Sequence, residues 1–136
     1  MKYLDTSIVI AHVVKDSLEH ESCKAIIQAL VSKKEKALFS GLNISEIFYV
    51  LQREKLTIDR IRKTIHEVVK MPGITLAEVS NEKILEGLTW AEKYQIDLTD
   101  AVTYLLMKKY KIKEIYSLDK HYDKFKDIHR LTELKA

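Results

Sequence analysis

Residues 3–10 are Tyr3-Leu4-Asp5-Thr6-Ser7-Ile8-Val9-Ile10, an apolar run interrupted by one acid and two hydroxyl residues. Residues 2–4 are typical of a short first strand, and residues 7–14 of an apolar segment that enters a helix. A charge between two apolar runs must be capped, paired or liganded, because burying it alone is costly. Asp5 is therefore either the N-cap of the following helix or a functional carboxylate.

Predicted strands and helices alternate along the rest of the chain. Further strands are expected at residues 37–40, 74–79, 114–118 and 128–131. Helices are expected at residues 16–31, 43–54, 58–69, 81–94 and 99–110, with a short helical turn at 120–125. This order predicts an α/β fold with a mainly parallel sheet covered by helices on both faces. Functional side chains should then gather beyond the carboxyl ends of the strands.

The overall composition is that of an ordinary globular protein, with 46% hydrophobic and 32% charged residues. No break in composition divides residues 1–136, so we expect a single domain. No apolar run reaches the roughly 18 residues that a membrane span needs. Asp5 argues against a signal peptide, and the lone Cys23 excludes an internal disulfide. The expected location is the cytoplasm, with no membrane association.

The formal net charge is only +3, which is weak evidence for a polyanionic partner. The basic residues gather in three clusters, which are Lys33/Lys34/Lys36, Arg60/Arg62/Lys63 and Lys108/Lys109/Lys111/Lys113. Each cluster is interpreted first as a solvated helix end or turn, and a nucleic-acid surface is the alternative.

Acids follow the other predicted strands, and each has an ordinary structural explanation. Glu46 comes three residues after Asn43, the spacing of a capping box. Asp97 and Asp100 begin the nearly all-apolar helix at 99–110, where the helix dipole favours acids. Asp119 ends the strand at 114–118, with Asp123 four residues further on.

Taken together, these acids lie on one predicted edge of the sheet. Converging carboxylates raise each other's pKa unless a cation compensates. Oxygen ligands suit Mg²⁺ or Mn²⁺, and the absence of a paired Cys or His motif disfavours zinc. Apart from His121, which is left open, the histidines are expected at the surface; they are His12, His20, His66 and His129.

Four segments of the chain resemble the acidic motifs of PIN domains, in their usual order and spacing. They are Leu4-Asp5-Thr6-Ser7, Asn43-Ile44-Ser45-Glu46-Ile47, Thr99-Asp100-Ala101 and Ser117-Leu118-Asp119-Lys120-His121-Tyr122. The resemblance spans nearly the whole chain, and its size is similar to that of the VapC ribonuclease toxins of toxin–antitoxin pairs. It implies a three-layer α/β/α sandwich and a Mg²⁺- or Mn²⁺-dependent site that cleaves RNA.

The resemblance also implies roles for individual residues. Asp5, Glu46, Asp100 and Asp119 would be the catalytic acids. Asp5, as the central ligand, would hold the metal with Asp100 and Asp119, while Glu46 would bind metal directly or orient the attacking water. The supporting residues would be Thr6, Ser117, Asp97 and Asp123, and Asp123 is close enough to share or replace the role of Asp119.

Partners follow from the resemblance alone. An antitoxin would lay an apolar helix in a groove and send an Arg or Lys toward the acids, with the exposed side of residues 45–55 as one wall. A homodimer is compatible with this kind of domain. The alternatives are an RNA-processing nuclease without an antitoxin, a non-catalytic interaction module and a receiver-like signalling module. The receiver is disfavoured because Asp5 has no adjacent acid and residues 74–79 contain no Asp.

Overall fold

The computed structural model describes residues 1–14 and 18–134, and its centre is a five-stranded sheet. The strands are β1 (Lys2–Leu4), β2 (Ala37–Ser40), β3 (Ile74–Ala77), β4 (Glu114–Tyr116) and β5 (His129–Leu131). Their order is β3-β2-β1-β4-β5, and every neighbouring pair is parallel. The predicted parallel sheet is confirmed, although β3, β4 and β5 are shorter than expected.

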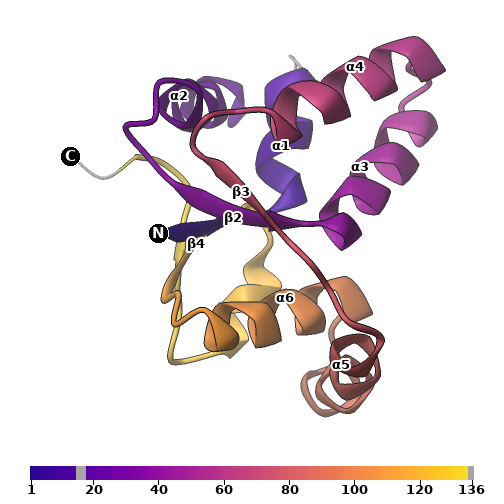
Figure 1. The fold of residues 1–136 in the computed structure, drawn as a ribbon, viewed down its shortest axis with the longest axis vertical. Coiled ribbons are helices and arrows are strands. Elements are labelled where there is room, and N and C mark those ends of the chain that lie inside the picture. Colours follow the sequence, from indigo (N-terminus) through magenta and orange to yellow (C-terminus); the bar gives the residue numbers. More distant parts are fainter. Residues whose placement is uncertain (15–17, 135–136) are drawn as a thin grey trace.

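Helices cover both faces of this sheet, as Figure 1 shows. On one side lie α1 (Thr6–Val13), α2 (His20–Val31), α3 (Gly41–Arg53) and α4 (Ile58–Val69). On the other side lie α5 (Asn81–Tyr94) and α6 (Leu98–Lys109), and a 3₁₀ helix, η1 (Lys120–Lys124), follows β4. The predicted three-layer α/β/α arrangement is therefore confirmed.

Two expected helix starts are wrong by two residues or more, and the starts expected at residues 7 and 99 are each one residue late. The helix predicted from residue 16 begins at His20, and residues 15–17 lie outside the described part of the chain. The helix predicted from Asn43 begins at Gly41, because Ser40 is its N-cap. The Ser40 backbone N–H donates to Asn43 Oδ1 at 3.2 Å, so Asn43 occupies the third helical position of the capping box. Glu46 therefore has no capping role.

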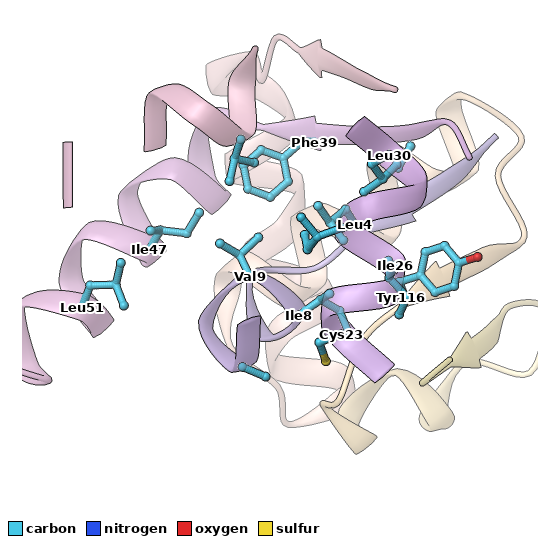
Figure 2. Close-up of a cluster of buried hydrophobic side chains, with 14 of the residues drawn as sticks. Leu4, Ile8, Val9, Cys23, Ile26, Leu30, Phe39, Ile47, Leu51 and Tyr116 are labelled. Atoms are coloured by element: carbon cyan, nitrogen blue, oxygen red, sulfur yellow. The ribbon is translucent and has the colours of Figure 1, made fainter. Parts of the chain in front are cut away.

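The central strands β1 and β2 are mostly apolar and buried on both sides because each side packs against helices. Leu4 and Phe39 face α1, α2 and α3, where Ile8, Ile26 and Ile47 complete a buried cluster (Figure 2). Tyr3, Leu38 and Ile115 belong to the cluster on the other face. Two separate cores thus hold the sheet in place, and its carboxyl edge is left for polar side chains.

None of the helices within the described residues has the length and apolar character needed to cross a membrane.

Gly73 marks a close backbone approach between α2 and the sheet. Its N–H donates to the Leu30 carbonyl at 2.9 Å, and its own carbonyl accepts from the Ala37 N–H at 2.8 Å. A Cβ at residue 73 would lie 2.4 Å from the Glu35 carbonyl oxygen and 2.7 Å from that of Leu30.

We expect Gly73→Ala to lower the free energy of unfolding by about 1–3 kcal/mol, since backbone atoms cannot easily give way. Chemical denaturation measures this change. Gly41→Ala is the matched control, because a Cβ there meets no atom within 4 Å and should cost no stability. Equal stability of the two variants would contradict the packing argument.

Candidate functional site

A pocket of about 390 Å³ lies at the carboxyl edge of the sheet. The strand order reverses beside β1, since the chain first winds through β2 and β3 and then returns through β4 and β5. Such a reversal opens a crevice in parallel sheets. Five of the predicted acids line this pocket, and they are Asp5, Glu46, Asp97, Asp100 and Asp119.

Asp5 connects the end of β1 to the end of β4. It is 3% exposed, and its Oδ2 accepts hydrogen bonds from Ser7 Oγ and Ser117 Oγ, both at 2.7 Å. The Ser7 backbone N–H also donates to Oδ2, at 3.4 Å, so Asp5 caps α1 as well. The two roles considered for Asp5 are therefore compatible, because one oxygen accepts the capping and serine hydrogen bonds.

Ser7 and Ser117 connect the end of β1 to the backbone that follows β4 through hydrogen bonds. Ser117 Oγ accepts from the Asp119 backbone N–H at 2.9 Å, and Ser7 Oγ accepts from the Leu118 N–H at 2.9 Å. Each hydroxyl thus donates to Asp5 and holds the backbone after β4. Ser117 was singled out from the sequence, but Ser7 was not, since its contact with Leu118 spans 111 residues.

Asp100 lies in the first turn of α6 and is 3% exposed. The Tyr122 hydroxyl donates to Asp100 Oδ1 at 3.1 Å, and it lies 3.4 Å from Asp5 Oδ1. Asp100 Oδ2 is 3.1 Å from His121 Nδ1. Tyr122 therefore spaces the two buried carboxylates, a role that nothing but its place in the fourth motif could have suggested.

Asp119 is the fourth acid at the pocket. Its Oδ1 accepts from the His121 backbone N–H at 2.9 Å and lies 3.3 Å from His121 Nδ1. One potential metal-ligand atom from each of Asp100, Asp119 and His121 lies within 4.8 Å of the other two, close enough to hold one metal ion. The sequence suggested oxygen ligands alone, whereas the structure adds a nitrogen.

Asp123 turns away from this cluster. It forms an ion pair with Arg130 at 3.0 Å, and its side chain is 53% exposed. Asp97 does line the pocket, as the N-cap of α6, but its side chain makes no capping hydrogen bond. Of the two candidates for the fourth position, the structure places Asp119 at the pocket and Asp123 outside it.

Buried polar side chains support the pocket from below. Asn43 is fully buried, accepts from the Tyr3 hydroxyl at 2.6 Å and donates to Thr6 Oγ1 at 3.1 Å. Thr6 lines the pocket next to Asp5. Asn43 thus joins β1, α1 and α3, a structural role that the sequence did not reveal.

The expectation of surface histidines is wrong for His12 and His20, which are half-buried.

The pocket is electrostatically unfavourable for its own acids. Burial raises the pKa of Asp5, and the nearby Asp119 charge adds to this. Burial also raises the pKa of Glu46, with further contributions from the charges of Asp5 and Asp97. The pKa of Asp100 is raised to about 7, mainly by burial and then by the charge of Asp119.

No lysine or arginine among residues 1–14 and 18–134 lines this pocket. Clustered, partly desolvated carboxylates without a compensating side chain have the donor chemistry that hard divalent cations prefer. The residues present therefore fit a divalent metal.

Comparison with known proteins gives one family and several similar solved structures, including the two that follow. The PIN domain family model matches residues 2–128. The structure of VapC20 from Mycobacterium tuberculosis, described as a sarcin–ricin loop cleaving toxin, is 17% identical with a TM-score of 0.76, and the match covers 91% of this chain and 94% of that one. VapBC2 from Rickettsia felis, bound to a promoter DNA fragment, is 14% identical with a TM-score of 0.69, covering 96% and 98%. No curated protein sequence matches the chain.

The raised pKa of Asp100 predicts a pH-dependent stability of the metal-free protein. The folded state binds the Asp100 proton more tightly than the unfolded state does. The resulting contribution to the free energy of unfolding is fully present below about pH 4 and is lost as the pH rises through about 7. Asp100→Asn removes the penalty of the charged form.

In EDTA at pH 8, we expect the Asp100→Asn variant to unfold at a temperature roughly 3–6 °C above that of the wild type, the shift that about 1 kcal/mol produces at this size. At pH 4 the difference should shrink. Thermal unfolding followed by circular dichroism measures both. A variant less stable than the wild type at pH 8 would refute the electrostatic interpretation.

Proposed function

Because the chain belongs to the PIN domain family, we propose that it is a divalent-metal-dependent endoribonuclease and the toxin of a toxin–antitoxin pair. One observation carries the proposal: acids from four separate segments meet in a pocket that no described lysine or arginine lines. The residues assigned to catalysis are Asp5, Glu46, Asp100 and Asp119.

Asp100 and Asp119, whose oxygen atoms lie with a His121 nitrogen within 4.8 Å of one another, would hold Mg²⁺ or Mn²⁺. Asp5 lies outside that group but lines the same pocket, and it is assigned as a further ligand. When bound, such an ion supplies positive charge for the phosphate oxygens and Lewis acidity for the attacking water and the leaving oxygen. Without that charge the pocket would repel an RNA phosphodiester.

The chain's own residues orient the reacting groups. Ser7 and Ser117 fix the carboxylate of Asp5, and the Tyr122 hydroxyl sets its position relative to Asp100. Hydrogen bonds of this kind keep ligating carboxylates in one geometry. Glu46, which lines the same pocket from α3, is assigned to orient the attacking water.

Apolar side chains beside the acids support the proposal that an antitoxin protein binds at this pocket. Ile10, Ala11 and Val14 line the pocket from the α1 side, and Val50 lines it from α3. An apolar helix of a partner could cover this wall and direct a cationic side chain at the carboxylates. Tyr49, which belongs to the exposed side of residues 45–55, is 59% exposed and does not line the pocket. A processing nuclease without an antitoxin is the alternative.

The substrate is RNA, and ribosomal RNA is the first candidate to test, since one structural relative is described as cleaving the sarcin–ricin loop.

Asp119 and Asp123 provide a matched pair of variants for the fourth acid. We expect Asp119→Asn to lower cleavage of total RNA by at least about 100-fold, because it removes a ligand. Asp123→Asn should retain wild-type cleavage within a few-fold, since it removes only an exposed ion pair with Arg130. Gel assays with Mn²⁺ measure both, and the reverse ranking would refute the assignment.

Asp5→Asn tests the central ligand. The amide oxygen can still accept the hydrogen bond from the Ser7 N–H, so the fold should remain while cleavage is abolished. EDTA should abolish wild-type cleavage, and added Mg²⁺ or Mn²⁺ should restore it. Divalent-dependent cleavage by the pure Asp5→Asn protein, or cleavage by the wild type in EDTA, would be inconsistent with this mechanism.

A further inference from the structure

A second concave region lies on the other side of α1 from the acidic pocket. Two adjoining cavities of about 530 and 540 Å³ share His12, Lys63 and Glu67 in their walls. They lie between α4 and the α1–α2 pair, all on the same face of the sheet (Figure 1). We call this region the basic groove, and its basic residues are Lys24, Arg60, Lys63, Lys70, His12, His20 and His66.

The charge of the groove is strongly one-sided. Among the described residues, four cationic side chains line it, from α2, α4 and the C-cap of α4, and Glu67 contributes the one carboxylate in its lining. Glu67 contacts Lys63 only at 4.0 Å, and both side chains are more than 60% exposed, so this pair neutralises little of the field. The sequence suggested that Arg60 and Lys63 belong to a solvated helix end. In the structure they line the same cavity as Lys24, which comes from α2.

Two imidazole rings form part of the wall. The His20 Nδ1–H donates to the Ala11 carbonyl at 3.0 Å, because a carbonyl can only accept, and this bond fixes the ring. The His12 ring lies parallel to it, with 6.0 Å between centroids. Flat rings beside cations are a common surface for unpaired RNA, which is bound through its phosphates and the faces of its bases.

The acidic pocket creates the need for such a surface. No described lysine or arginine lines it, so a polyanionic strand must be held by cations elsewhere. Within the described residues, the α1 segment contributes to both regions: Ile10 and Val14 line the acidic pocket, whereas His12 and Val13 line the basic groove. A helix is about 10–12 Å wide, a distance that a few nucleotides span.

We propose that the basic groove binds the phosphate backbone of the RNA substrate, a few nucleotides from the phosphate that is cleaved. This inference rests on the proposed ribonuclease function, since it assigns a binding surface for the same substrate. On this proposal the groove binds RNA of any sequence through its phosphates, and the acids of the other pocket cleave it.

The test compares two double variants that remove the same charge. Arg60→Gln/Lys63→Gln alters the groove, and Lys109→Gln/Lys113→Gln alters exposed lysines at the end of α6 and before β4. Each full-length protein is titrated, in EDTA to prevent cleavage, against a fluorescein-labelled single-stranded RNA of 20 nucleotides. Fluorescence anisotropy gives the Kd at several salt concentrations, and thermal unfolding verifies that both variants fold.

We expect the groove variant to weaken binding about tenfold and to reduce the salt dependence, log K against log salt, by about 1.4, the value for two lost phosphate contacts. The control should change the Kd less than about twofold. Equal weakening by both variants, or an unchanged Kd in the groove variant, would overturn the inference. Polyglutamate that binds the wild type as tightly as RNA would overturn it in favour of an acidic protein partner.

Cleavage assays separate this inference from the proposed function. If the wild type cleaves RNA and the groove variant binds RNA as the wild type does, the groove inference alone is wrong. If the groove variant loses RNA binding but the wild type cleaves no RNA with any divalent ion, the proposed function is wrong and the RNA-binding surface stands.

Discussion

The structure depends on one buried carboxylate that is held without a cationic side chain. Asp5 Oδ2 accepts hydrogen bonds from Ser7 and Ser117, and so joins the end of β1, the start of α1 and the end of β4. Those hydrogen bonds compensate for part of the cost of burying the charge, but the pKa of Asp5 is still raised. Either a proton or a bound cation can balance the remaining charge of such a group.

The remaining acids intensify the same constraint. Asp100 and Asp119 approach Asp5 from α6 and from the turn after β4, and the charge of Asp119 raises the pKa of both Asp5 and Asp100. Tyr122 and His121 place donors among them, so the geometry is set before any ligand arrives. The buried, mutually repelling carboxylates lower the stability of the folded state at this edge of the sheet, and they make the site favourable for a bound cation.

The α1 helix separates two surfaces of opposite character. Its Ile10 and Val14 side lines the acidic pocket, and its His12 and Val13 side lines the basic groove. The proposed ribonuclease activity would require both kinds of surface, because acids that hold a metal would repel the rest of the polyanion. Placing them on two sides of one short helix keeps both within reach of a single strand.

The sequence by itself determined the parallel α/β order, the bounds of α4 and α5 and the position of Asp5, Asp100 and Asp119 after strands or at a helix start. Hydrophobic periodicity and chain order are local properties, so they can be predicted from neighbouring residues. Only the tertiary structure separated Asp119 from Asp123, made Ser40 the N-cap with Asn43 as the third helical residue, and brought Ser7 and Tyr122 into the site. Those outcomes depend on side-chain direction and on contacts such as that between Asp5 and Ser117, 112 residues apart, which no local pattern specifies.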